Sequence, residues 1–258
     1  MISFFIKKAF FDGWGNLLGI FCFNIVYIML TVLGVSGFAY LGASAAVLGT
    51  LSILLLLLVI SILMGGTASV VLNYSNYERD SWSAFRSGIV RNIRHSLVLF
   101  FFLAVFVINI FFTIPFYMGN YGILGIVVSV VLIWLEVLIL LCLPYYFPLM
   151  NLLPADRPLK TVKKCLIIIA DNLGFTIFFL FYNAVCLALT IFTLGLIPGT
   201  TGMQLASQDA VKLLMFKHDW MEENPDADKK HVPWADLLFD EKEKVGPRSL
   251  KNMIFPWK

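Results

Sequence analysis

Residues 48–72 read LGTLSILLLLLVISILMGGTASVVL, a stretch without a single charged side chain. A helix needs about 20 apolar residues to cross the hydrocarbon core of a bilayer. Four more runs of this kind occur along the chain, and together they predict an all-α integral membrane protein. The five runs are Leu17–Phe38, Leu48–Leu72, Ser96–Met118, Ile123–Phe147 and Leu173–Ile197. The first is long for the apolar part of a signal peptide and further spans follow it, so we expect it to stay uncleaved.

The overall composition agrees with this fold class. Of the 258 residues, 60% are hydrophobic and only 14% are charged, and the mean hydropathy is +0.87. These values lie outside the range of soluble domains. A formal net charge of +3 is too small to indicate a nucleic-acid partner. The cysteines stand singly at 22, 142, 165 and 186, so the sequence predicts no disulfide framework, no metal site and no cofactor.

A sixth stretch, Gly199–Phe216, decides the number of spans. It is shorter than the others and carries Gln204, Gln208, Asp209 and Lys212, so it cannot face lipid on all sides. Gln204, Gln208 and Lys212 recur every four positions and therefore line one face of a helix, which can turn toward the other helices. We expect a bundle of six transmembrane helices, with five as the alternative.

The distribution of Lys and Arg indicates the orientation, because short basic connections stay in the cytoplasm. The connections 73–95 and 151–172 are rich in Lys and Arg, whereas 37–47 and 119–122 contain neither. We therefore predict a protein of the cytoplasmic (inner) membrane with a cytosolic N-terminus. The side on which the tail lies depends on whether residues 199–216 cross the membrane.

Three parts of the chain follow from these predictions. Residues 1–16 form an N-terminal interfacial segment, residues 17–216 form the transmembrane bundle, and residues 217–258 form a polar C-terminal tail. The tail carries large apolar groups, including Leu237–Phe239 and Met253–Phe255, which are uncommon in disordered linkers. We expect it to be cytosolic and docked on the protein's own cytosolic face, on lipid headgroups or on a partner subunit.

The basic connections are also expected to contain one or two interfacial amphipathic helices. Trp82, Phe85, Ile89 and Ile93 are three or four positions apart and form an apolar stripe. Such a helix lies with its apolar face in the membrane and its cations toward lipid phosphate, and the alternative is that these are solvated loop charges. Residues 73–112 and 151–188 form a weak internal repeat. Each stretch runs from the end of a span, through an acid–Arg pair and a basic amphipathic segment, into a Phe-rich span. The expected phosphate contacts are Arg86, Arg91, Arg94, Lys160, Lys163 and Lys164.

Some of these features carry a resemblance to a known family. They are a first span with Asn16 and Asn24, a turn of small residues at 34–46, and the segment SWSAFR at 81–86, which leads through Asn92 into the third span. Together they resemble the YesL-like family, which comprises bacterial integral membrane proteins of unknown function that are often associated with carbohydrate uptake systems. The resemblance covers residues 1–216. Residues 42–45 depart from the Pro-Ala-Thr type of turn expected there, and the resemblance implies no catalytic residue.

Glu136, within the apolar run 123–147, is the strongest functional hint. An ionisable group near the bilayer centre costs roughly 2.5–3.5 kcal/mol on insertion scales, so it is normally neutral, paired or facing water. At about 1.5 Å per residue, four amide side chains lie at a similar depth. The alternative interpretation is structural, with interhelical hydrogen bonds and a protonated Glu136. The predicted intramembrane polar cluster comprises Glu136, Asn109, Asn183, Gln204 and Gln208.

The sequence contains no Gly-rich phosphate loop, HExxH pair or nucleophile elbow, so we expect no enzyme. The predicted function is that of a non-enzymatic accessory or partner subunit of a membrane system. Membrane lipids and, through the tail, a transporter subunit or another membrane protein are the expected partners. The alternative is a small transporter or channel that uses the polar cluster around Glu136.

Overall fold

The computed structural model describes residues 1–225 and 232–248, and the regular structure within these ranges is helical. Five helical segments are long and apolar enough to cross a membrane, so this is an all-α, multi-pass membrane protein. The third candidate span consists of α5 (Ile93–Ile108), the π-helical turn η1 (Asn109–Thr113) and α6 (Ile114–Asn120). The other four are α2 (Leu17–Ser44), α3 (Ala46–Ser75), α7 (Gly122–Leu152) and α9 (Leu173–Phe192).

Helix α10 (Gly199–Glu223) contains the sixth stretch but is not among these candidate spans. Its side chains between Thr201 and Leu214 are mostly buried, because α10 packs against α1, α2, α3 and α7. Of the two numbers of spans that the sequence left open, five is the one that length and apolarity support. The domain boundary expected between 216 and 217 falls inside α10 and does not separate two parts of the structure.

The chain repeats one structural unit three times. Each unit starts with a short helix that is followed directly by an asparagine. A long outgoing helix comes next, and a return helix follows it. The amides of Asn16 and Asn172 donate to the carbonyl four residues earlier, at 2.9 and 3.2 Å, which satisfies the end of the short helix. The sequence predicted two copies, and the structure adds residues 2–75 as a third. The short helices are α1 (Ile2–Gly15), α4 (Ser81–Arg91) and α8 (Pro158–Asp171), and the return helices are α3, α7 and α10.

The three units pack in a closed ring. The return helices α3, α7 and α10 contact one another, and each short helix packs on the return helix of the preceding unit. Thus α4 lies on α3, α8 lies on α7, and α1 closes the ring by packing on α10. The burial of α10 follows from its place in this ring, since it is the return helix of the third unit.

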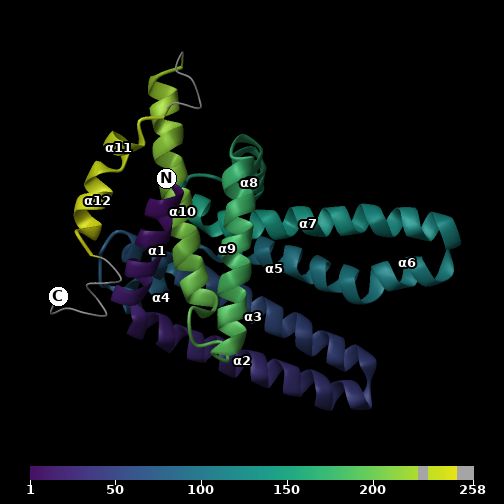
Figure 1. Ribbon diagram of the computed structural model, residues 1–258. Coiled ribbons are helices and arrows are strands. Elements are labelled where there is room, and N and C mark those ends of the chain that lie inside the picture. Colours follow the sequence, from purple (N-terminus) through teal and green to yellow (C-terminus); the bar gives the residue numbers. More distant parts are fainter. Residues whose placement is uncertain (226–231, 249–258) are drawn as a thin grey trace.

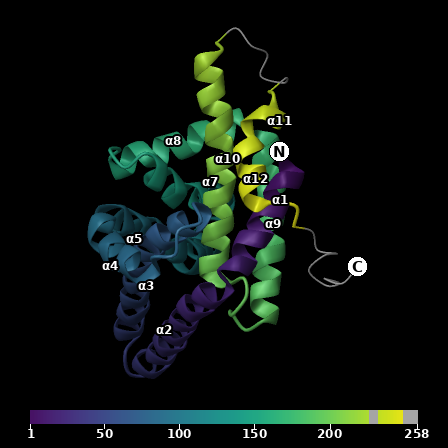
Figure 2. The same ribbon diagram turned by 90° about the vertical axis from the view of Figure 1, so that its left-hand side faces the viewer.

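The third unit runs in a different direction from the other two. Figure 1 shows the α2–α3 and α5–α7 pairs extending to the right while α9 and α10 run vertically, and α9 and α10 remain vertical in the turned view of Figure 2. The α9–α10 turn lies against Asn24, whose amide donates to the carbonyls of Leu196 and Pro198 at 2.8 and 2.7 Å. Asn24 lies about 10 Å along α2, so this turn does not reach the tip of the α2–α3 pair.

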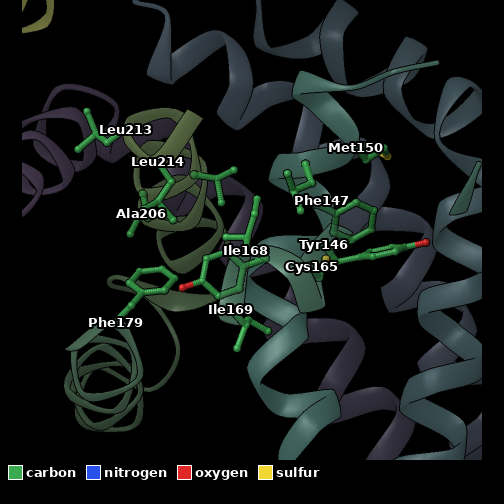
Figure 3. Packing of buried hydrophobic residues seen from close by; sticks show 14 of the residues in the cluster. Tyr146, Phe147, Met150, Cys165, Ile168, Ile169, Phe179, Ala206, Leu213 and Leu214 are labelled. Carbon is green, nitrogen blue, oxygen red and sulfur yellow. The ribbon is translucent and has the colours of Figure 1, made fainter. Parts of the chain in front are cut away.

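The main hydrophobic core lies where α1, α7, α8, α9 and α10 meet, and Figure 3 shows much of it. Phe5 of α1 is fully buried and meets four aromatic rings of α9 edge-on, with ring centroids 5.0 to 6.1 Å apart. Such edge-to-face contacts stabilise beyond the area they bury. The N-terminal segment is therefore part of the main core as well as the start of the first unit.

Helix α4 carries the apolar stripe that was expected to face the membrane, but part of this stripe packs on protein. Phe85 and Ile89 lie over Gly66 of α3, where an added Cβ would come within 2.7 and 2.8 Å of them. Trp82 remains 66% exposed. The expectation that the whole stripe faces lipid is therefore corrected, since its central residues pack on protein and Trp82 points outward. The small residues at this point of α3 allow the close approach.

Candidate functional site

Glu136 is buried and paired within the α5–α7 unit. Asn109 Nδ2 donates to Glu136 Oε1 at 2.6 Å, and the Glu136 side chain is only 3% exposed, so it does not face lipid. Asn109 is the first residue of η1, and π-helical turns of this kind often occur at functional positions. The second oxygen, Oε2, is buried without a hydrogen-bond partner in the described protein. The pair joins the two long helices of this unit.

Gln204 and Gln208 of α10 lie away from the Glu136–Asn109 pair and bond to other residues. Thr67 Oγ1 donates to Gln204 Oε1 at 2.6 Å and lies 2.9 Å from the hydroxyl of Tyr27. Asn151 Nδ2 donates to Gln208 Oε1 at 2.8 Å. Asn151 is about 22 Å along α7 from Glu136. The predicted five-residue cluster therefore divides into the Glu136–Asn109 pair and a group of amides around α10.

The α10 amides line a groove, which we call the amide groove. It is a cavity of about 530 Å³ between α3, α5, α7, α9 and α10. Gln204, Gln208 and Asn183 all line it, together with Asn151. Asn183 donates within its own helix to the carbonyl of Phe179, at 2.9 Å. The groove therefore contains three of the five predicted residues and one further amide, Asn151, that sequence reasoning missed.

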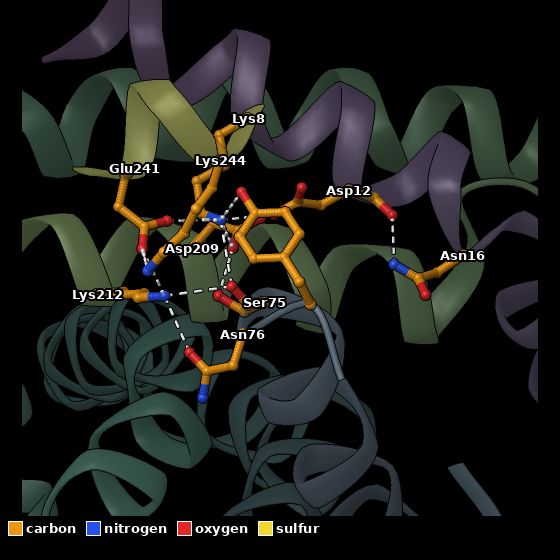
Figure 4. A network of polar contacts seen from close by, with 10 residues as sticks. Lys8, Asp12, Asn16, Ser75, Asn76, Asp209, Lys212, Glu241 and Lys244 are labelled. Carbon is orange, nitrogen blue, oxygen red and sulfur yellow. Dashed lines mark hydrogen bonds and ion pairs between the residues drawn. The ribbon is translucent and has the colours of Figure 1, made fainter. Parts of the chain in front are cut away.

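A second polar site, the charge cluster, consists of Lys8, Asp12, Asp209, Lys212 and Glu241 (Figure 4). Lys8 Nζ lies 2.7 Å from Asp12 Oδ2, 3.1 Å from Glu241 Oε2 and 3.6 Å from Asp209 Oδ1. Lys212 Nζ lies 3.1 Å from Glu241 Oε1. The cluster joins α1, α10 and α12 (Phe239–Val245), and all of its side chains except Lys212 are buried.

The connection after α3 completes the surroundings of this cluster. Ser75 Oγ donates to Asp209 Oδ1 at 2.7 Å, and the Ser75 carbonyl accepts from Lys8 and Lys212 at 3.3 and 3.2 Å. Lys8 also donates to the Tyr77 hydroxyl at 3.1 Å. These bonds matter because a buried ammonium group is strongly destabilising unless each of its protons has an acceptor.

Three carboxyl groups face three ammonium groups here, because Lys244 Nζ also lies 3.2 Å from Glu241 Oε1. Only the ammonium group of Lys8 is fully buried among the carboxyl groups. Burial, followed by repulsion from Asp209, raises the pKa of Asp12 to about 7. Burial alone would lower the pKa of Lys8, but the attraction of Asp209 and Asp12 outweighs it and raises that pKa overall. Burial also raises the pKa of the neighbouring Asp209, so Asp12 and Asp209 together can take up a proton near neutral pH.

Residues 232–248 of the tail dock on the protein itself. Leu238 and Val245 are buried, and Lys7 Nζ donates to the carbonyl of Gly246 at 3.0 Å. Short helix α11 (Trp234–Leu237) precedes α12, and Trp234 packs against the main core. Of the three surfaces considered for the tail, this segment uses the protein's own. Met253–Phe255 lies outside the described residues.

The six cations expected at lipid phosphate differ in their surroundings. Lys160 lies 2.7 Å from Asp156, which also pairs with Lys164. Arg91 donates to Ser69 Oγ at 3.0 Å, although its side chain is otherwise exposed. Arg86, Arg94 and Lys163 are exposed. Contact with lipid phosphate stays a prediction for this set, and Lys160 and Lys164 already have a carboxylate partner.

Within residues 1–225 and 232–248, no group of three His, Cys, Asp or Glu side chains is placed to hold a metal ion. No protein-family model, curated protein or solved structure matches the chain. The resemblance to the YesL-like family therefore stays a prediction.

Proposed function

We propose that this chain is a non-enzymatic accessory or partner subunit of a membrane system in the cytoplasmic membrane. Its N-terminus and docked tail would lie in the cytosol, on the side of the basic connections. Figure 1 supports a common side for these parts, since α1, α4 and α12 lie at the end opposite to the tips of the α2–α3 and α5–α7 pairs. A role beside a carbohydrate uptake system rests on the family resemblance alone.

The observation that carries the proposal is the outward face of α2. Ser36, Ala39 and Ala43 lie along one side of the distal half of this helix, and all three are exposed. Membrane helices pack closely on one another through small residues, whereas faces that contact only lipid have no need of them. This face therefore fits a helix of another membrane protein.

The bonding of the intramembrane polar groups supports a non-catalytic role. Glu136 is bonded to Asn109, Gln204 to Thr67, and Gln208 to Asn151. Each bond joins two helices, as expected for polar side chains that hold a membrane bundle together.

Quantitative affinity purification from native membranes in mild detergent tests this proposal. Four tagged chains are compared: wild type, Ala39→Leu, Thr31→Leu, and a chain truncated after Asn224, which retains all of α10. Thr31 is exposed on the same helix but lies about 80° to 140° round the helix axis from Ser36, Ala39 and Ala43, so Thr31→Leu is the matched control. We expect a membrane protein to co-purify in stoichiometric amount with wild type and Thr31→Leu, and to be lost from Ala39→Leu.

Two results would overturn this proposal. One is a wild-type chain that purifies alone, and the other is a partner retained equally by Ala39→Leu and Thr31→Leu. Loss of the partner from the truncated chain as well would assign part of the interface to the tail.

A small transporter or channel is the second candidate, favoured by Glu136 Oε2, which is buried without a partner beside a π-helical turn. Its test is solute and proton flux in liposomes that contain the purified chain. Flux that Glu136→Gln abolishes would support it, and equal flux in liposomes with and without protein would exclude it under those conditions.

A further inference from the structure

The amide groove lies at the centre of the repeat, where the three return helices meet. Asn151 of α7 donates to the carbonyl of Ala68 in α3 at 2.7 Å and to Gln208 of α10 at 2.8 Å. One side chain therefore connects all three return helices. Membrane proteins built from repeats commonly bind their ligands where the repeats meet, because irregular and polar groups gather there.

Two hydrogen-bonding atoms in the groove have no partner in the described protein. Gln208 Nε2, a donor, and Asn151 Oδ1, an acceptor, are both buried and unsatisfied, and the Gln208 side chain is 0% exposed. A buried amide atom without a partner typically costs about 1–3 kcal/mol. Both side chains line the groove and are joined through their other two atoms, Asn151 Nδ2 and Gln208 Oε1. A hydroxyl group both donates and accepts, so it has the chemistry to pair with either unsatisfied atom.

The prolines of α7 add a backbone acceptor at the same place. Pro144 and Pro148 lie inside this helix and line the groove. Proline has no N–H group, so the carbonyl of Pro144, which lines the groove, loses the donor it would have in a regular helix. The carbonyl of Leu140 loses its donor in the same way, but Leu140 lies outside the groove lining. The groove thus offers more than one acceptor and at least one donor, which matches a ligand with more than one hydroxyl group.

The charge and the shape of the groove limit the class of ligand further. The residues that line the groove include no charged side chain, and apart from its amides and hydroxyls the lining is apolar. A volume of about 530 Å³ lies within the range of small-molecule sites. An adjoining apolar pocket of about 320 Å³ shares Leu143, Asn183, Leu187 and Met203 with it. An apolar chain can therefore continue from the amides past Leu187, which is half exposed on α9.

We propose that the amide groove binds a neutral lipid whose headgroup carries free hydroxyl groups, such as a monoacylglycerol. The hydroxyls bond to Gln208, Asn151 and the carbonyl of Pro144, and the acyl chain lies along Leu143 and Leu187. A fatty acid would bring a carboxylate into an uncharged site, and a hydrocarbon would leave the amide atoms unpaired.

The test measures equilibrium binding of radiolabelled 1-monooleoylglycerol to the full chain in phosphatidylcholine nanodiscs, with binding to empty nanodiscs subtracted. Leu187→Trp fills the groove from its apolar side. Leu189→Trp is the matched control, because Leu189 lies on the same helix and is exposed to a similar extent, 49% against 52%. Gln208→Met removes the unpaired donor while keeping the length of the side chain.

We expect saturable binding by wild type and Leu189→Trp. Leu187→Trp and Gln208→Met should bind about tenfold more weakly, the factor that corresponds to the loss of one good hydrogen bond or of comparable packing. Oleate and octadecane should compete poorly. Equal binding by Leu187→Trp and Leu189→Trp would overturn the proposal, as would competition by octadecane as effective as that by unlabelled monooleoylglycerol.

Discussion

Glu241 of α12 places its Oε2 atom 3.1 Å from Nζ of Lys8 in α1, so two residues far apart in the sequence form one buried ion pair. Asp12 and Asp209 share the same ammonium group. Lys8 therefore lies at the centre of three carboxyl groups and connects α12 of the tail with α1 and α10.

Replacing Lys8 and replacing Asp12 should have very different effects. Lys8→Met leaves three buried carboxyl groups facing each other, and the loss of one partner of a buried pair typically costs about 3–5 kcal/mol. Asp12→Asn leaves Lys8 paired with Asp209 and Glu241 and should cost about 1 kcal/mol or less, the value of one ordinary hydrogen bond. Thermal unfolding of both purified variants in the same detergent measures the difference. Equal destabilisation would show that the cluster depends on the Asp12 carboxylate as much as on Lys8.

The raised pKa of Asp12 predicts a dependence of stability on pH. That pKa is about 7 in the folded protein, above its ordinary value of 3.8, so the folded state binds the proton more tightly than the unfolded state. The stabilising contribution is therefore complete below pH 4 and is lost as the pH rises toward 7, by at most about 1.4 kcal/mol per pH unit. The raised pKa of Asp209 acts in the same direction, whereas the lowered pKa of Glu241 acts only at more acidic pH and the raised pKa of Lys8 only above pH 10.

Unfolding temperatures of wild type and Asp12→Asn between pH 5 and pH 8 measure this effect. The advantage of wild type over the variant should shrink up to about pH 7 and then stay constant. Lys8, Asp209, Glu241 and Tyr77 face Asp12 in both chains, so the comparison reports the Asp12 carboxyl group together with its repulsion of Asp209. A constant difference across the whole range would contradict the raised pKa.

The long apolar runs could be predicted from the sequence because a membrane span depends mainly on local composition. The place of α10 could not, because its burial depends on α1, which is far away in the sequence. The Lys8–Asp12 spacing of four positions in an apolar helix was the one local signal of the charge cluster. Neither Asp209 nor Glu241 could be assigned to it, since only the closed ring and the docked tail bring them there.

The separation of Glu136 from the α10 amides also could not be predicted from local sequence patterns. Counting residues from the ends of spans gives a common depth only if all helices run parallel. The α9–α10 pair crosses the other two pairs (Figures 1 and 2), so equal counts do not mean neighbouring positions. The amides therefore gather around Asn151, whereas Glu136 meets the residue opposite it on α5–η1–α6.

The substitution Gly66→Ala tests the packing of α4 on α3. A Cβ at this position would lie 2.7 Å from Phe85 and 2.8 Å from Ile89, closer than real contacts allow. Gly66→Ala should therefore destabilise by about 1–3 kcal/mol, as overpacking does elsewhere. Gly37→Ala is the matched control, because nothing lies within 4 Å of its added methyl group. If Gly66→Ala unfolds at the same temperature as Gly37→Ala, α4 does not pack on α3 in this way.

Glu136 offers the sharpest distinction between a structural and a chemical role. Glu136→Gln keeps an acceptor for Asn109 Nδ2, whereas Glu136→Leu leaves that donor buried and unpaired. We expect the Gln variant to match wild type in stability to within about 1 kcal/mol, and the Leu variant to lose about 1–2 kcal/mol, the usual size of a polar contact between membrane helices. Thermal unfolding in detergent ranks the three chains. Should the Gln variant be as unstable as the Leu variant, the hydrogen bond to Asn109 would not explain the burial of Glu136, and the ionisable group itself would be required.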